Sequence, residues 1–148
     1  MFRKLIITAA VIVMAGCSAI KNEQTTKNVH NKVHDYCQTD FNGDRLQLNE
    51  NLKQYVSWEE ESGWDHFTVI EGFKIDSIKI ADASATVVVE YAVVGSVNDS
   101  LLLNPQPKQE VITFNLSKTG SGWRINSPLI PPHVSLQKTK ELISTNQL

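Results

Sequence analysis

The feature that most constrains the fold of this sequence is an alternating pattern around residues 85–94. Every second residue there is apolar, and the set comprises Ala85, Val87, Val89, Tyr91 and Val93. Successive side chains of a β-strand point to opposite faces of a sheet. The pattern therefore predicts a strand over Thr86–Val94 with one face in a hydrophobic core, while Glu90 helps to make the other face partly polar.

A second strand is predicted to begin at Phe67, but its alternation changes parity halfway. Apolar residues occupy odd positions up to Ile75 and even positions at Ile78 and Ile80. A shift of one residue moves side chains to the opposite face of a sheet, so the sequence predicts a β-bulge or bend within this strand.

Two shorter strands are predicted further along the chain, at Glu110–Ser117 and Trp123–Asn126. A glycine-containing hairpin turn at residues 118–122 joins them. Residues 95–108 are rich in Asn, Asp and Pro, and we expect them to form a loop.

Helical periodicity flanks the strands. Apolar residues recur at i, i+4, i+7 and i+8 in Val29, Val33, Tyr36 and Cys37. This stripe predicts a helix that begins near Asn28. A weaker pattern at Leu48, Leu52, Tyr55 and Val56 predicts a second helix, and residues 135–144 predict a last one.

Helices followed by a meander of antiparallel strands indicate an α+β fold. We expect N-terminal helices packed on a curved antiparallel sheet, with a short C-terminal helix. The chain has 148 residues, of which 41% are hydrophobic. This length and composition predict a single domain over residues 28–148.

Residues 1–16 have the organisation of a secretory signal peptide. Arg3 and Lys4 precede an apolar run of eleven residues, which is shorter than the roughly 20 residues that span a bilayer. The run ends in Met14-Ala15-Gly16-Cys17, which resembles the lipobox of bacterial lipoproteins. The resemblance implies cleavage before Cys17 and acylation of Cys17, which would attach the chain to a lipid bilayer.

The same resemblance gives the segment after the signal peptide a role. Residues 17–27 are expected to comprise the lipidated cysteine and a flexible polar tether. Ser18, rather than Asp, follows Cys17, which implies sorting to the outer membrane, facing the periplasm. Loss of residues 1–16 removes Arg3 and Lys4 and no acidic residue, so the formal net charge changes from −2 to −4. No cluster of basic residues remains, and nucleic acid is not expected as a partner.

The order of the predicted elements also resembles a known fold. The leading helix, the run from Phe67 to Val94, and a late hairpin that ends in Gly122-Trp123-Arg124-Ile125 are similar to the cone of nuclear transport factor two-like, cystatin-like proteins. The resemblance covers roughly residues 28–130. It implies a curved sheet that can enclose a pocket, and it implies no particular reaction.

The densest group of aromatic and polar side chains lies between Trp58 and His66. The two tryptophans, Trp58 and Trp64, flank the run Glu59–Glu61, and Asp65 and His66 follow directly. Tryptophans beside carboxylates can line a ligand-binding mouth or anchor a partner protein. A solvated helix end with one tryptophan in the core is the alternative, and we expect Trp58 to be the more buried of the two.

Acid–base chemistry inside such a cone would draw on four residues: Tyr36, Asp65, His66 and Tyr91. We expect Tyr91 to point inward. No pair among them has a spacing diagnostic of an enzyme, and no catalytic, cofactor or metal-binding motif occurs in the sequence.

Two further residue types were weighed as reactive groups. His30 and His34 share a helix face at a spacing that can chelate a metal, but no third ligand lies nearby in the sequence, so a polar helix face is expected. Cys37 lies on the apolar stripe and is expected to behave as a small buried hydrophobe.

These features together predict a membrane-anchored, non-enzymatic lipoprotein that binds a protein of the cell envelope, without a cofactor or a metal. The alternative is a pocket protein for a small apolar ligand, with lyase or isomerase chemistry. A polar, accessible cavity behind Tyr91 and Phe73 would favour the alternative, whereas a filled core would favour protein binding.

Overall fold

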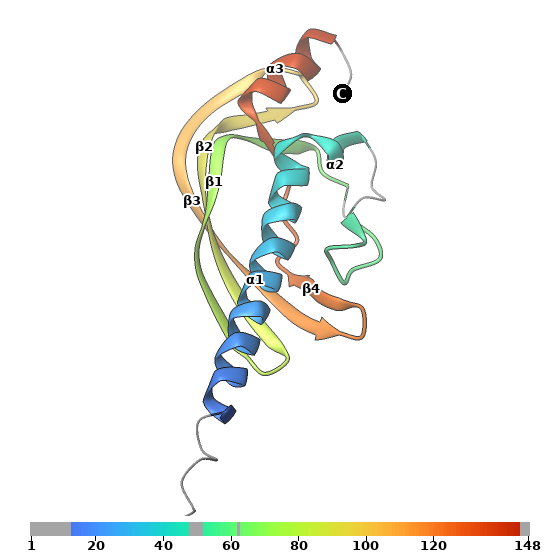
Figure 1. The fold of residues 1–148 in the computed structure, drawn as a ribbon. Coiled ribbons are helices and arrows are strands. Elements are labelled where there is room, and N and C mark those ends of the chain that lie inside the picture. The colour runs from blue at the N-terminus through green and yellow to red at the C-terminus, as the bar shows by residue number, and fades with distance from the viewer. Residues whose placement is uncertain (1–12, 48–51, 62, 146–148) are drawn as a thin grey trace, which may run out of the picture.

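The computed structural model describes residues 13–47, 52–61 and 63–145. The fold is α+β, as predicted, with a long N-terminal helix, a curled five-stranded sheet and a short C-terminal helix (Figure 1). The elements are α1 (Val13–Phe41), α2 (Asp44–Gln47), β1 (His66–Ala81), β2 (Ser84–Asn98), β3 (Leu103–Thr119), β4 (Gly122–Ser127), β5 (His133–Ser135) and α3 (Leu136–Thr145).

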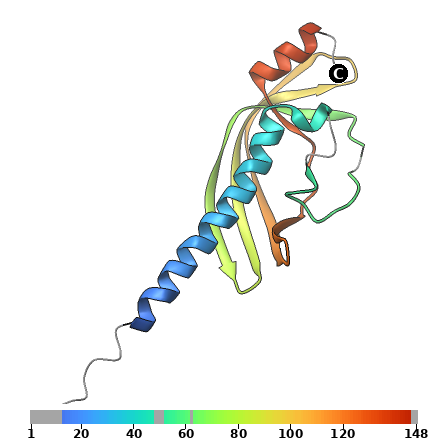
Figure 2. The same cartoon turned by 45° about the vertical axis from the view of Figure 1, so that its right-hand side comes forward.

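The sheet has the strand order β4-β3-β2-β1-β5. Strands β1 to β4 form an antiparallel meander, and β5 pairs in parallel with β1 over Thr68–Ile70. The predicted sheet was antiparallel throughout and lacked β5, because a strand of three residues is too short to give a periodic signal. The long strands curl around α1, which lies against their concave face (Figures 1 and 2).

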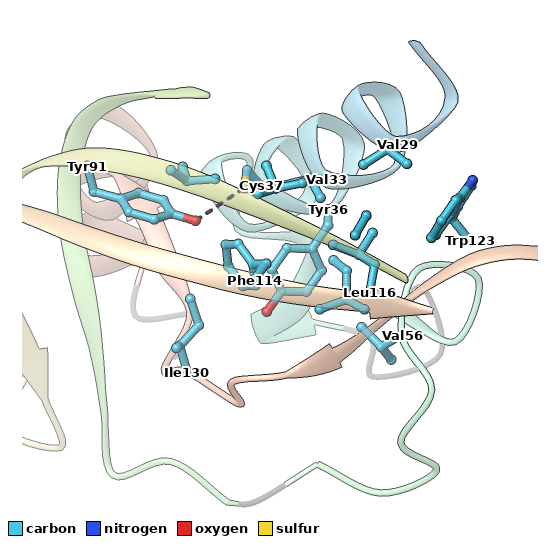
Figure 3. Packing of buried hydrophobic residues seen from close by; sticks show 14 of the residues in the cluster. Val29, Val33, Tyr36, Cys37, Val56, Tyr91, Phe114, Leu116, Trp123 and Ile130 are labelled. Carbon is cyan, nitrogen blue, oxygen red and sulfur yellow. Dashed lines mark hydrogen bonds between the residues drawn. The ribbon is translucent and has the colours of Figure 1, made fainter. Parts of the chain in front are cut away.

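The core lies between α1 and the concave face of the sheet, and it confirms the predicted stripes. Val29, Val33, Tyr36 and Cys37 of α1 are buried, and so are all the odd-numbered residues of β2 from Ala85 to Val97. The ring of Tyr36 meets that of Phe114 edge to face, with their centroids 5.6 Å apart. Figure 3 shows the four α1 side chains with Tyr91 and Phe114 of the strands.

The predicted irregularity of β1 is also confirmed. Its register with β2 shifts at Val69/Ile70, at Ile70/Gly72 and at Ile75/Ser77. The last shift coincides with the change in the parity of the apolar residues. The bulges bend β1 and increase its twist, which lets the sheet curl around α1.

The start of α1 differs from the prediction. The helix begins at Val13, not near Asn28, so residues 17–27 are helical where a flexible tether was expected. Residues 17–41 contain neither Gly nor Pro, and local hydrogen bonds such as that from the Thr25 hydroxyl to the Lys21 carbonyl (2.8 Å) add to the helix. An exposed helical segment has no apolar stripe, and for this reason periodicity did not reveal it.

The second predicted helix is not formed by the part of residues 48–56 that the structure describes. Leu52 begins a turn, closed by a 2.7 Å hydrogen bond from the Tyr55 amide to the Leu52 carbonyl, and Val56 forms an isolated bridge with Ile125. Leu48 lies outside the described residues. Leu52 and Val56 are buried without a helix, so their spacing reflected burial alone.

The predicted loop at residues 95–108 is wrong as well, because β2 continues to Asn98 and β3 begins at Leu103. The prolines of this stretch are tolerated because β4 pairs only with residues 115–119 of β3, which leaves the first half of β3 at the edge of the sheet. Pro105 faces Gly95. A Cβ atom at Gly95 would lie 2.2 Å from the Asn104 carbonyl oxygen, so the two strands approach closely only because this residue is glycine.

Candidate functional site

A cleft of about 400 Å³ opens where the segment before β1 meets the turn between β2 and β3. Three of the predicted site residues, Trp64, Asp65 and His66, line it, and we name it the Trp64 cleft. Its remaining lining residues are Arg45, Leu46, Glu61, Gly63, Phe67, Val97, Asn98, Asp99, Leu101 and Pro132.

The side chains of Trp64, Asp65 and His66 contact one another at the mouth of the cleft. The Trp64 and His66 rings meet edge to face with their centroids 6.4 Å apart, and His66 Nδ1 lies 2.7 Å from Asp65 Oδ1. The hydrogen bond from His66 lowers the pKa of the Asp65 carboxyl group. Trp64 is half-buried, and its indole N–H is buried without a hydrogen-bond acceptor among the described residues.

The base of the Trp64 cleft contains a buried ionic network centred on Arg45. Its guanidinium group pairs with Asp40 at 3.1 Å and with Glu61, and it donates to the Ile130 carbonyl at 2.7 Å. Burial raises the pKa of Asp40, although Arg45 and His133 act in the opposite direction. Because a buried charge is costly without partners, this network fixes the segment around Glu61 against α1 and β5.

Trp58 lies in an adjoining cleft of about 320 Å³, which we name the Trp58 cleft. Its lining residues are Leu52, Lys53, Val56, Trp58, Glu59, Glu60 and Glu61. Glu61 lines both clefts, so they meet there. The half-buried Trp58 packs against the main hydrophobic core, whereas Trp64 belongs to neither core cluster of the described chain.

Tyr91, the remaining predicted site residue of the domain, lies in the core and lines neither cleft. Its hydroxyl group lies 3.1 Å from the Cys37 sulfur (Figure 3), and its ring packs on His133 and Phe73, with centroids 4.5 and 6.2 Å away. Burial raises the pKa of the Cys37 thiol to about 12. The Tyr91 side chain is therefore packed within the core, and Cys37 is the buried hydrophobe that the sequence predicted. Surface clefts lie beside both ring partners of Tyr91: Phe73 lines one of about 270 Å³, and His133 lines another.

An ionisable pair that the sequence did not predict lies in a third, polar cleft of about 240 Å³, the Glu110 cleft. His133 Nε2 lies 3.2 Å from Glu110 Oε2, and His133 Nδ1 donates to the Pro131 carbonyl at 2.7 Å. The hydrogen bond from His133 lowers the pKa of Glu110. Both ring nitrogens of His133 thus face oxygen atoms, one of a peptide carbonyl and one of a carboxylate.

Known proteins offer no guide to this site. No protein family, curated protein or solved structure matches the chain. The resemblances to lipoproteins and to the cone fold stay predictions, and the chemistry of the site must be inferred from its own residues.

The other predicted positions are spread over α1. Cys17 belongs to its first turns, in the part that extends away from the sheet (Figure 2). The exposed rings of His30 and His34 stack nearly in parallel, with their centroids 5.9 Å apart. The described residues contain no group of three or more His, Cys, Asp or Glu side chains that could hold a metal ion.

Proposed function

We propose that this chain is a membrane-anchored, periplasm-facing lipoprotein that binds a protein of the cell envelope and has no enzymatic role. The observation that carries the proposal is the pair of adjoining surface clefts lined by Trp64 and Trp58, whereas the Tyr91 side chain is packed within the core. The Trp64 cleft combines a half-buried aromatic ring with charged groups at its margin. Tryptophan is one of the residues enriched among those that dominate protein–protein binding energies.

The geometry of α1 supports the membrane-anchored part of the proposal. Most of residues 20–28 are exposed, and Val29 is the first residue of the helix known to be buried. At 1.5 Å per residue, the helix rises about 18 Å between Cys17 and Val29. An acylated Cys17 would therefore hold the domain on a helical stalk above the bilayer. No helix among the described residues is long and apolar enough to cross a membrane.

Replacement of Cys17 by Ser tests the anchor. We expect the Cys17→Ser variant to accumulate as an unprocessed precursor and to incorporate no labelled palmitate, because the lipobox reaction requires the cysteine sulfur. Wild-type protein labelled in parallel is the control. Normal processing of the variant to a soluble periplasmic product would contradict the lipoprotein assignment.

Capture from detergent-solubilised membranes tests the binding role. We expect Trp64→Ala to reduce capture of an envelope protein roughly thirtyfold, since an aromatic anchor often contributes about 2 kcal/mol, with a melting temperature close to that of the wild type. Trp58→Ala is the comparison for stability and should lower the melting temperature, because Trp58 packs on the core as well as lining the Trp58 cleft. Loss of stability in Trp64→Ala equal to its loss of capture would contradict a recognition role.

A second candidate function, binding of a small molecule with acid–base chemistry, is favoured by one observation. The Glu110 cleft places a carboxylate and a buried imidazole 3.2 Å apart, which is the spacing of a proton-transfer pair. Retention of a small apolar carbonyl compound by the wild-type protein, lost in Glu110→Gln, would favour this candidate. Retention by both proteins alike, or by neither, would exclude it.

A further inference from the structure

Four exposed carboxylates line the Trp64 and Trp58 clefts, against one exposed lysine, Lys53. Glu59 and Glu60 line the Trp58 cleft, Asp65 and Asp99 line the Trp64 cleft, and all four residues are exposed. Among the described residues, only Asp65 of these four has an ion-pair partner, the exposed His66. The facing surface of a bound molecule should therefore be positively charged.

The base of the Trp64 cleft requires a different kind of group. The indole N–H of Trp64 and the Nε–H of Arg45 are both buried, and neither has an acceptor among the described residues. Arg45 lines the cleft although it is only 3% exposed. Two carboxylate oxygens of the same network, Asp40 Oδ1 and Glu61 Oε1, are also buried without a hydrogen bond among the described residues, although Glu61 Oε1 forms the ion pair with Arg45. Because Asp40 and Glu61 already balance the charge of Arg45, the two unpaired donors call for neutral acceptor oxygens rather than for another carboxylate. Peptide carbonyl groups have this property.

Part of the lining of the Trp64 cleft is apolar. Leu101, Val97 and Pro132 line it, and the neighbouring Leu102 is 71% exposed. A leucine as exposed as Leu102 beside an aromatic cleft provides apolar area that a docked side chain can cover. The clefts thus offer acidic, apolar and hydrogen-bond-donating surfaces side by side.

We propose that the two adjoining clefts bind an extended segment of the partner protein in which Lys or Arg alternates with apolar residues. Its cations face Glu59, Glu60, Asp65 and Asp99, its apolar side chains cover Trp64 and Leu102, and its main-chain carbonyls accept from the donors at the base. This inference rests on the proposed function, whose partner it specifies. The same four carboxylates repel nucleic acid and anionic lipid headgroups.

The test uses the full chain in non-ionic detergent and two fluorescein-labelled nonapeptides, one of alternating Leu and Lys and the other of alternating Leu and Glu. We expect anisotropy titrations to show binding of the Lys peptide only, weakened severalfold between 50 and 300 mM salt on the scale over which such attraction is screened. The double variant Asp65→Lys/Asp99→Lys should weaken binding about tenfold or more.

Two controls make the test specific. Asp35→Lys/Asp76→Lys changes the net charge equally at exposed positions outside both clefts and should bind the Lys peptide like the wild type. Asp65→Asn/Asp99→Asn removes the charges conservatively, should melt like the wild type, and should weaken binding to an intermediate degree. Binding of both peptides alike, binding of neither, or equal weakening in the control double variant would overturn the inference.

The capture experiment separates this inference from the proposed function. If capture of the envelope protein depends on Trp64 but not on salt or on Asp65→Lys/Asp99→Lys, the recognition site stands and the basic segment is wrong. If Trp64→Ala captures as much as the wild type does, the proposed function itself fails.

Discussion

Val89 and Glu90 are neighbours in β2 whose side chains have opposite surroundings. Val89 is fully buried against α1, whereas Glu90 is half-buried on the outer face and pairs with Lys74 at 2.9 Å. Val89→Asp should lower the free energy of unfolding by more than about 3 kcal/mol, because it buries an unpaired charge. Glu90→Lys should cost about 1 kcal/mol or less, because it replaces a largely solvated ion pair by a repulsion.

Urea unfolding of the two variants measures this difference directly. Equal destabilisation would mean that the outer face of β2 is as dry as the inner one.

The Glu110–His133 pair makes a prediction about pH. The pKa of Glu110 is lowered below its ordinary value of 4.5, mainly by the hydrogen bond from His133. A carboxyl group with a lowered pKa in the folded state stabilises the fold above its unfolded pKa, and this contribution is lost as the pH falls through the folded value. Glu110→Gln should therefore destabilise the protein at pH 7 by about 1 kcal/mol, and the difference from the wild type should shrink towards pH 3.

Melting temperatures measured from pH 3 to pH 7 test the prediction, and Glu71→Gln at an exposed position of β1 is the control. A difference that stays constant over this range would show that the carboxylate charge has no part in the pair.

At the scale of elements, the sequence predicted those features that a repeated hydrophobic pattern encodes. The stripe on α1, the alternation of β2 and the bulge of β1 are repeated signals, and all three were confirmed. The exposed part of α1 and the short β5 have no such repeat. Strand β3 includes Pro105 although proline disfavours strands. Pairing with β2 stabilises this part of β3, and a pattern within one segment of the sequence does not reveal such pairing.

The residues of the candidate site also fall into two groups, those that the sequence could predict and those that it could not. Trp64, Asp65 and His66 are consecutive, so their joint position in one cleft could be predicted from the sequence. Glu110 and His133 lie 23 residues apart and are brought together only by the path of the chain from β4 to β5. Arg45 and Glu61 meet through the same kind of long-range packing, and no spacing in the sequence indicates it.

The two residues of the turn between β1 and β2 differ in the sign of their φ angle. Asp82 has a φ of 52°, in the left-handed region, whereas Ala83 is not among the described residues with positive φ. A β-branched side chain is strained at positive φ. Asp82→Val should therefore cost about 1–2 kcal/mol, and Ala83→Val, the matched control in the same turn, should cost less than about 0.5 kcal/mol.

Thermal unfolding of the pair measures this difference. Similar melting temperatures for both variants would show that the turn relaxes to another conformation at no cost.

For the molecule as a whole, α1 connects two ends with different properties. Cys17 lies near its first residue, and Arg45 and Leu46, which line the Trp64 cleft, follow shortly after its last residue, Phe41. The helix rises about 36 Å between Cys17 and Phe41. If Cys17 is acylated, the Trp64 cleft lies near the end of α1 that is remote from the bilayer, where a partner in the periplasm or its peptide segment can reach it. Figure 2 shows α1 running from its free first turns to the sheet.

The division of α1 into stalk and core predicts how the fold responds to truncation. A chain that begins at Thr25 loses only exposed helix among the residues whose side chains are described, so its melting temperature should stay within about 2 °C of that of the longer chain. A chain that begins at Lys32 also loses the fully buried Val29 and exposes its neighbours. This should cost about 2–3 kcal/mol, or roughly 5–10 °C for a domain of this size. Circular dichroism melts of the two chains decide the matter, and a large loss already at Thr25 would mean that the stalk packs on the domain.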